Sequence, residues 1–376
     1  MKKILLASAS IVAFAGAAAA EVNFAGDAKL GYNDDVEDGF YWDAGLTAKL
    51  SQDLDNGLTV AASLDIDLTR DNAGSLGNVT TSDWVVTLSN ADGSLSFGDV
   101  ATAASTFAFV GDMDAGINDH TEDYTTTLAG AAAATANNDG LLAKYSFGDF
   151  SIAASTQIND EGATGEDGAT QVAAAATLGG INVGILSVSD EAAGVVSDAA
   201  INDALLVSLG GTFAGVDVTV NAGNVNNVDR MGVAVSYAVG DYTLGASLSD
   251  DDGNAEVTTS YSVAYAAGAV TAKGYYTDNR GGVNGDNEWS VAVAYDMGNG
   301  LVINAGIIDG ETAGAGTDDD QYNYIAADYS LGGGASFLVS YADANNDATA
   351  NSNDIDTTLG GYELKSGLTA QLKLAF

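Results

Sequence analysis

The interval from Asp99 to Leu141 concentrates side chains that could do chemistry: carboxylates, aromatic rings and His120, the chain's single histidine. A Ser–His–acid hydrolase cannot be inferred from one histidine and dispersed hydroxyls. The sequence also lacks a phosphate-binding glycine motif and a histidine-rich metal constellation. These residues therefore give little support to catalysis. The acidic, aromatic and histidine side chains of this interval are Phe107, Phe109, Asp112, Asp114, Asp119, His120, Glu122, Asp123 and Tyr124.

The length of this interval is itself informative. At about forty residues it far exceeds every other gap between turn signals, and loops this long in a compact domain are usually functional. Its mixture of aromatic and acidic residues predicts a folded element over residues 100–140. An ordinary extracellular loop is the alternative.

The elements that must position this interval are indicated by a recurring turn, in which a glycine stands three positions after a tyrosine. From Tyr237 to Tyr329 the unit recurs every 28 to 34 residues, enough for two strands and their connections. Tyrosine at a strand end suits a membrane interface, because its ring meets lipid and its hydroxyl meets water. The repetition predicts an all-β, transmembrane, antiparallel up-and-down β-barrel. The expected interface aromatics are Trp42, Tyr145, Tyr237, Tyr265, Tyr295, Tyr329 and Phe376.

Alternation of period two assigns side chains to lipid or lumen. In the C-terminal strand, read back from Phe376, the apolar face carries Leu374, Leu372, Leu368, Leu364 and Tyr362, and the other face carries Lys373, Gln371 and Thr369. In the first two strands Leu30 and Trp42 fall on the lipid face, whereas Lys29 and Lys49 fall on the lumen face.

Counting alternating segments between turn signals gives about twenty strands, and hairpins can be overcounted in this way. Short glycine turns on one side and longer acidic loops on the other are typical of outer-membrane barrels. The chain has no proline and no cysteine. The absence of proline fits a barrel made of central strands, and the absence of cysteine excludes disulfides and thiolate metal sites. No change in composition marks a second domain, so residues 21–376 are expected to form one barrel.

Residues 1–20 have the pattern of a secretory signal peptide: Lys2 and Lys3, an apolar stretch from Ile4 to Ala15, and small residues at 17–20. No other stretch approaches the ~20 apolar residues of a membrane-spanning helix. Removing residues 1–20 leaves 9 basic and 52 acidic residues, a charge of −43. Such a chain will not bind nucleic acid through phosphates and will attract cations, although solubility or adaptation to salt also explains acidity.

Acidic runs at 250–252 and 318–320 could bind Ca²⁺ or Mg²⁺ through carboxylate oxygens. Their spacing matches no EF-hand, and solvated loop charge is the alternative. No cofactor is expected to be required, and no specific metal ligands can be assigned.

Three segments resemble one known family, the general diffusion porins of Gram-negative bacteria, in particular the alphaproteobacterial, Rhodobacter-type porins. Residues 21–31, EVNFAGDAKLG, resemble that family's first strand, and Ser96–Asp99, SFGD, resembles the end of its fifth strand before the long third loop. Residues 331–336, LGGGAS, resemble its penultimate turn. The resemblance implies an outer-membrane trimer of 16-stranded barrels whose third loop folds inward and narrows the pore.

The resemblance also implies which residues form the constriction. Loop acids would face basic residues of the barrel wall across a narrow aqueous passage, and opposed charges of this kind orient water and penalise large apolar solutes. By resemblance the loop acids are Asp112, Asp114, Asp119, Glu122 and Asp123, and the wall candidates are Lys29, Lys49, Lys144 and Arg70.

The function so implied is a water-filled, cation-selective channel for ions and small hydrophilic solutes. Its expected partners are outer-membrane lipid, lipopolysaccharide and two further copies of the chain. A structural or surface-interaction barrel, or an exported acidic β-solenoid, neither with an open pore, is the alternative from another functional class.

Overall fold

The structure is a computed structural model, and it describes residues 21–34, 39–69, 79–106, 140–158, 170–189, 203–225, 227–252, 256–279, 285, 287–311, 320–345 and 355–376. These residues form strands, tight turns and one short 3-10 helix. No helix among them is long and apolar enough to cross a membrane.

Over the residues just given, the strands follow one another with one short 3-10 helix among them. The first half contains β1 (Glu21–Asn33), β2 (Phe40–Asp53), β3 (Thr59–Thr69), β4 (Val79–Ser89), β5 (Gly93–Gly98), η1 (Ala104–Thr106), β6 (Gly140–Phe147), β7 (Phe150–Gln157), β8 (Thr170–Leu178), β9 (Ile181–Ser189), β10 (Asp203–Phe213) and β11 (Val216–Val225). The second half contains β12 (Val228–Val239), β13 (Tyr242–Asp251), β14 (Thr258–Ala267), β15 (Val270–Asp278), β16 (Asn287–Gly298), β17 (Leu301–Glu311), β18 (Asp320–Gly332), β19 (Ala335–Asn345), β20 (Ile355–Asp356), β21 (Glu363–Leu364) and β22 (Gly367–Ala375).

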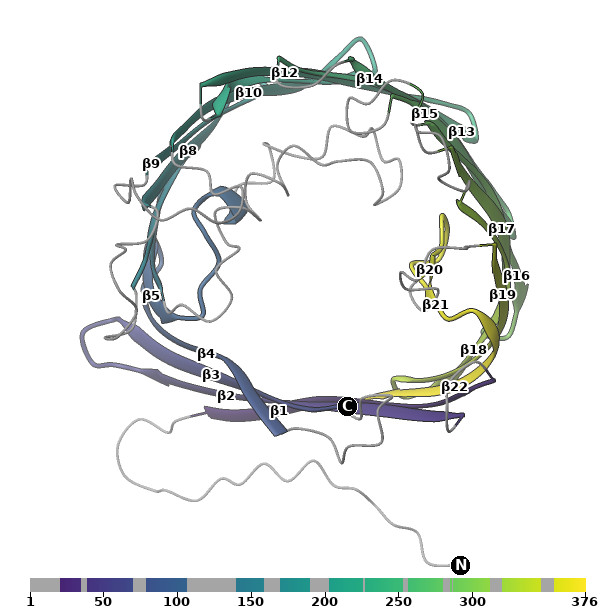
Figure 1. The fold of residues 1–376 in the computed structure, drawn as a ribbon. Coiled ribbons are helices and arrows are strands. Elements are labelled where there is room, and N and C mark those ends of the chain that lie inside the picture. The colour runs from purple at the N-terminus through teal and green to yellow at the C-terminus, as the bar shows by residue number, and fades with distance from the viewer. Residues whose placement is uncertain are drawn as a thin grey trace, which may run out of the picture.

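Twenty of these strands form a single closed antiparallel sheet (Figure 1). Each strand pairs with its neighbour in sequence, except that β19 pairs with β22 across β20 and β21. The ring closes between β1 and β22, where Lys29 lies opposite Lys373 and Leu30 opposite Leu372. The predicted antiparallel up-and-down barrel of about twenty strands is confirmed. The sixteen strands implied by the resemblance are wrong, because the alternating segments between turn signals supply twenty.

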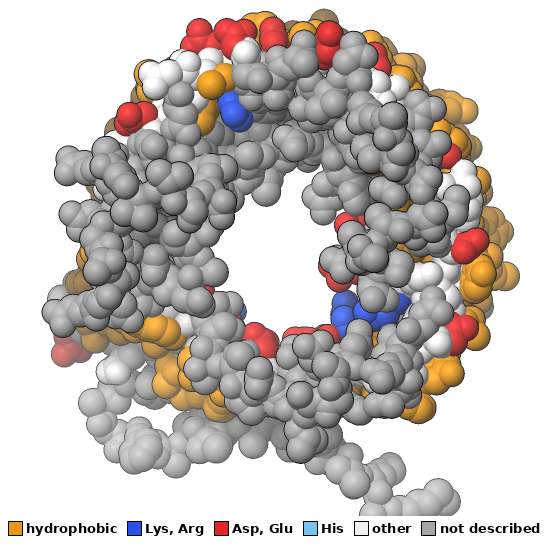
Figure 2. Space-filling view, viewed as in Figure 1, with side chains coloured by type: hydrophobic (Ala, Val, Ile, Leu, Met, Phe, Trp, Pro, Cys, Tyr) orange, Lys and Arg blue, Asp and Glu red, His pale blue; other side chains and the backbone are white. Residues whose placement is uncertain are grey.

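Side chains alternate between the two faces of the wall, as period two requires. In β10, Leu205, Val207 and Leu209 are exposed on the outside, whereas the intervening Leu206 and Ser208 are buried on the inside. The outer face carries most of the exposed large apolar side chains, and Figure 2 shows them along the outer rim of the ring. This is the arrangement expected of a wall whose outer face meets lipid.

Short hairpins join the strands at the positions that the glycine signals predicted. In the connection between β16 and β17, Asn299 and Gly300 have φ angles of 54° and 85°. Two successive residues of positive φ fit the right-handed twist of the flanking strands, and asparagine and glycine adopt that conformation most readily. The turn chemistry therefore sets the hairpin, and the hairpin sets which residues of the next strand face inward.

The last strand is shorter than the sequence pattern predicted. β22 begins at Gly367, and Tyr362 and Leu364, which the alternation placed on the lipid face, lie inside the ring instead. Leu364 is 1% exposed because it packs against the inner wall. An apolar side chain can leave water either by facing lipid or by packing on a dry protein surface. Alternation alone therefore could not show which of these two environments Tyr362 and Leu364 occupy.

The described residues of the inner wall form two apolar patches, each covered by chain from within the ring. The first apolar patch, on β6–β11, consists of Leu142, Ala153, Ala173, Leu186, Val188, Ala204, Leu206 and Val225. The second apolar patch, on β16–β19, consists of Ala292, Ile308, Tyr324, Ala326, Leu338 and Ala342. We name their covers the first inward segment (residues 101–106) and the second inward segment (residues 355–364).

Candidate functional site

The first inward segment leaves β5 and turns onto the inner wall, where Figure 1 shows η1 within the ring. Ala103 is fully buried, and its backbone N–H donates to Ser155 Oγ at 2.8 Å. The N–H of Ala104 donates to Gln171 Oε1 at 3.1 Å, and Gln171 is 1% exposed. A buried backbone donor without a partner costs free energy, so these two acceptors fix where the chain can enter the lumen.

The described start of the 100–140 interval therefore lies on the inner wall. The five predicted loop acids, Asp112, Asp114, Asp119, Glu122 and Asp123, lie outside the described residues, as does His120. Their roles at a constriction stay predictions.

The second inward segment is a small hairpin in its own right. Ile355 pairs with Leu364 and Asp356 with Glu363, as β20 and β21. The Thr357 N–H donates to the Tyr362 carbonyl at 3.0 Å, and the Tyr362 N–H donates to Thr357 Oγ1 at 3.0 Å. These hydrogen bonds pair backbone groups of the turn within the segment itself. Those groups can therefore be buried without losing a hydrogen-bond partner.

Apolar side chains and polar contacts both hold this hairpin to the wall. Ile355 and Leu364 are 2% and 1% exposed, and they pack on the second apolar patch. Thr358 makes a hydroxyl–hydroxyl hydrogen bond with Ser290 of β16, and the Asn304 side-chain amide of β17 donates to the Leu359 carbonyl. The segment thus spans contacts to four consecutive strands of the wall.

The phenol of Tyr362 adds a titratable group to the contact between this hairpin and the wall. Its hydroxyl donates to Asp328 Oδ2 of β18 at 3.4 Å. Burial raises the pKa of the Tyr362 phenol above its usual range, and the neighbouring charge of Asp328 raises it further. The phenol therefore stays neutral at ordinary pH, in the form that can donate to the carboxylate.

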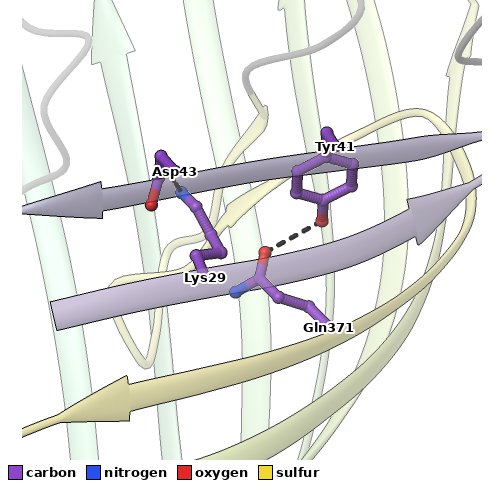
Figure 3. A network of polar contacts seen from close by, with 4 residues as sticks. All are labelled: Lys29, Tyr41, Asp43 and Gln371. Atoms are coloured by element: carbon purple, nitrogen blue, oxygen red, sulfur yellow. Dashed lines mark hydrogen bonds and ion pairs between the residues drawn. The ribbon is translucent and has the colours of Figure 1, made fainter. Parts of the chain in front are cut away.

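Charged and polar side chains gather on the inner face where β22, β1 and β2 meet (Figure 3). Lys29 Nζ lies 3.2 Å from Asp43 Oδ2, and the Tyr41 hydroxyl donates to Gln371 Oε1 at 2.9 Å. Lys365 Nζ lies 5.2 Å from the centre of the Tyr41 ring, a distance that permits a cation–π contact. The strand pairing adds Lys373 opposite Lys29. We call this group the charged seam.

A glycine makes the geometry of the charged seam possible. A Cβ atom at Gly31 of β1 would lie 2.1 Å from the Tyr41 ring, so only glycine lets the ring lie across the neighbouring strand. Tyr41 then reaches Gln371 two strands away and supports Lys365 above its face. The seam is therefore a built feature of the wall and not a chance collection of lysines.

The structure places three of the four predicted wall cations. Lys29, Lys49 and Lys144 occupy inward positions of β1, β2 and β6, as the alternation predicted. Lys29 is paired with Asp43, and Arg70 lies outside the described residues. The role of these side chains in a transverse field stays a prediction.

The list of predicted wall cations omitted four that the structure places on inward positions. They are Arg230 of β12, Lys273 of β15, Lys373 of β22 and Lys365, which lies between β21 and β22. The signal was present in the sequence, because each of the three strand residues alternates with exposed apolar neighbours such as Met231, Tyr276 or Leu374. Cations thus lie on several sides of the described inner wall.

The predicted interface aromatics lie on the outer face. Tyr237 and Tyr295 are 42% and 48% exposed and sit beside short turns, and Phe376 is 77% exposed. Tyr265 is half-buried against Tyr242, with ring centroids 5.0 Å apart. Tyr145 and Tyr329 are exposed, and Trp42 is half-buried. Their contact with the membrane interface stays a prediction.

Metal binding finds no preformed site within the part of the chain that the structure describes. No three histidine or acidic side chains gather there in a way that could hold an ion. The run at 318–320 lies mostly outside the described residues. The expectation of Ca²⁺ or Mg²⁺ at acidic loops stays untested.

Chemically, the described inner wall is suited to lining an aqueous passage. It is a closed surface on which cations, carboxylates, hydroxyls and amides face inward, with two apolar patches covered by inward segments. In Figure 2 acidic and basic side chains edge the centre of the ring, whereas apolar ones cover its rim. Charged groups lining an aqueous passage select among ions by field and by width.

Comparison with known proteins gives one family match. A family model described as Gram-negative porin matches residues 7–349. A triple mutant of the Rhodopseudomonas blastica porin is 19% identical, with a TM-score of 0.47, over 74% of this chain and 100% of that chain. A second mutant of the same porin is 15% identical, with a TM-score of 0.45, over 95% and 100% of the two chains. No curated protein matches the chain.

Proposed function

Since the chain belongs to the Gram-negative porin family, as a barrel of the outer membrane, we propose that its channel is water-filled and cation-selective and serves the passive diffusion of ions and small hydrophilic solutes. Transport of this kind needs no chemical turnover and no cofactor. The channel itself follows from the family and the closed barrel, and the selectivity is the part that requires a test.

The acidic excess of the chain carries the proposal of cation selectivity. The sequence has 52 acidic and 11 basic residues, two of the latter within residues 1–20. Several carboxylates occupy inward positions, among them Asp43 and Asp328, and Asp43 is already paired with Lys29. A lumen whose surroundings carry a large negative charge raises the local concentration of cations and lowers that of anions.

Reversal potential in a planar bilayer tests this selectivity. With a salt gradient at low ionic strength, the potential should take the sign set by the more permeant cation. The preference should weaken in concentrated salt, because the Debye length falls to ~3 Å at 1 M. A clear anion preference at low ionic strength would contradict the proposal, and an absence of ohmic steps would favour a barrel without an open pore.

We also propose the surroundings of the channel. The resemblance to general diffusion porins supports a homotrimer in contact with outer-membrane lipid and lipopolysaccharide, and the mature chain is proposed to begin at Glu21. Chemical cross-linking in detergent should yield a species of three chains. N-terminal sequencing of protein extracted from outer membranes should start at residue 21.

A further inference from the structure

We infer that the second inward segment, residues 355–364, is a second solute-restricting element of this channel, docked on the wall across the lumen from the first inward segment. The inference rests on the proposed channel function and adds a residue-level determinant to it. Figure 1 shows β20 and β21 inside the ring on the side away from η1.

The wall beneath the segment supplies the first argument. A strand between lipid and an aqueous lumen should be apolar outside and polar inside. On β16–β19 the inner face instead carries Ala292, Ile308, Ala326 and Leu338, each no more than 7% exposed. These side chains would face water if the segment were absent. The wall is therefore built to be covered.

The chemistry of the segment supplies the second argument. Removing an aliphatic side chain from water is favourable, and Ile355 and Leu364 are both buried. The contacts of Thr358 with Ser290 and of Leu359 with Asn304 fix the orientation in which they dock. A Cβ at Gly360 would lie 2.3 Å from the Tyr362 ring and 2.9 Å from Asn304 Nδ2, so the turn fits only as glycine.

The return of the chain to the wall is also fixed. Asn33 of β1 is fully buried, and its side-chain amide donates to the Ser366 carbonyl at 2.7 Å and to Thr369 Oγ1 at 2.8 Å. Lys365, next to Ser366, is held over the Tyr41 ring. The docked hairpin thus ends directly at the charged seam.

Barrel size supplies the third argument. The diameter of a barrel grows roughly linearly with its number of strands, and barrels of about 16–18 strands already leave an aqueous channel. Twenty strands enclose a wider lumen, which a single inward segment fills less completely. A second docked hairpin narrows it from another side. The hairpin also carries Glu363, exposed, close in sequence to Lys365 at the seam, and so adds charge as well as bulk.

Docking can be tested with engineered thiols, because the chain has no cysteine. Thr358→Cys, 5% exposed, should react slowly with a charged thiosulfonate reagent. Glu363→Cys, exposed on the same hairpin, is the matched control and should react fast. Adding Gly360→Val should accelerate Thr358→Cys and leave Glu363→Cys unchanged. Equal rates for the two cysteines in the native background would overturn the inference.

A cross-link provides an independent check of the same geometry. The hydroxyls of Ser290 and Thr358 touch, so Ser290→Cys with Thr358→Cys should oxidise to a disulfide in the folded barrel. Oxidised and reduced forms should conduct alike if the docked state is the conducting one. A disulfide that fails to form, or that alters conductance, would contradict the docked conducting state.

Conductance decides whether the docked hairpin restricts solutes. Deleting residues 355–364 leaves residues 346–354, 365 and 366 to join β19 to β22, which antiparallel neighbours permit. We expect larger single-channel conductance and faster liposome swelling with larger sugars. A companion variant combines the deletion with Ile308→Thr and Leu338→Ser. These substitutions make the newly exposed inner wall more polar, so that the deletion is less prone to cause misfolding.

The outcomes separate the two claims. A native protein that conducts, beside deletion variants that fold with unchanged conductance and sugar limit, would overturn the inference and leave the proposed function standing. A native protein without ohmic steps would overturn the proposed function and the restricting role with it. Thiol protection at residue 358 would still report whether the hairpin docks.

Discussion

Within the described part of the chain two segments enter the ring, and they are held in different ways. The first docks through backbone donors: the N–H groups of Ala103 and Ala104 find Ser155 and Gln171 on the wall. The second docks mainly through side chains: Ile355 is buried, and the Thr358 hydroxyl bonds to Ser290 of β16. One backbone group adds to this, because the Leu359 carbonyl accepts from the Asn304 side chain of β17.

The buried polar groups beneath the second inward segment are also less completely hydrogen-bonded. Beneath it, Ser340 Oγ and Asn304 Oδ1 are buried without a hydrogen-bond partner among the described residues, and an unsatisfied polar group costs about 1–3 kcal/mol. The wall acceptors of the first dock, Ser155 and Gln171, both receive a hydrogen bond. We therefore expect the second segment to be released more easily than the first.

The largest effect should come from deleting residues 107–124, which follow the first inward segment in the chain, together with the second inward segment. Deleting residues 107–124 should raise conductance by removing bulk on the first side, and deleting residues 355–364 should do so on the second. The double deletion should exceed either single one in single-channel conductance and in sugar size limit. If the double deletion matches one of the single deletions, only that side restricts solutes, and the comparison fails.

Charge on the first side should act mainly on selectivity. Neutralising Asp112, Asp114, Asp119, Glu122 and Asp123 together should reduce cation preference, because the field is removed while most of the bulk remains. Reversal potentials should shift toward zero, with a smaller change in sugar size limit. Glu363→Gln on the second side is the matched comparison and should shift selectivity less, since one charge is removed instead of five.

Opposite volume changes should loosen the two docks. Ile355→Ala leaves a cavity and should weaken the second dock by about 2–5 kcal/mol. Ala103→Leu overfills a fully buried site and should weaken the first dock by about 1–3 kcal/mol. Thiol labelling at residue 358 should accelerate in the Ile355 variant only. Acceleration in the Ala103 variant as well would show that the two docks are coupled.

The smallest effect should be that of pH. The pKa of Tyr362 is raised in the docked state, so neutral phenol favours docking. Its contribution is complete below the ordinary tyrosine pKa of about 10 and is lost as pH rises through the docked value. Conductance should therefore rise at alkaline pH in the native protein more than in Tyr362→Phe. The comparison between the two cancels the titration of lysines, and identical profiles would exclude a role for this phenol.

Much of the fold could be predicted because strands and turns are local. Alternation of period two assigned Lys29, Lys49 and Gln371 to the lumen, and the glycine signals marked the hairpins, including Asn299 and Gly300. The strand count of about twenty is confirmed, and the sixteen strands implied by the resemblance are wrong. The length of the interval from Asp99 to Leu141 predicted a folded element, and the first inward segment is the described start of that interval.

The second inward segment was not predicted, and the reason is physical. Leu364 and Tyr362 continue the apolar alternation of the last strand, so the sequence extends that strand to residues that fold away from it. A retrospective signal exists in strands such as β17, where Ile307 faces outward and Ile308 inward, apolar on both sides. Such a strand needs cover on its lumen face.

By itself the sequence determined the export pattern, the acidic charge, the alternation of each strand and the turns between them, because each depends on residues near one another in the chain. Only the tertiary structure decided which β16–β19 side chains form a dry patch, which hairpin covers it, and that Tyr41, Lys365 and Gln371 meet at the closing seam. Tyr41 and Gln371, for example, are 330 positions apart in the chain. The contact between Tyr41 and Gln371 exists only once the ring has closed and brought the two ends of the chain together.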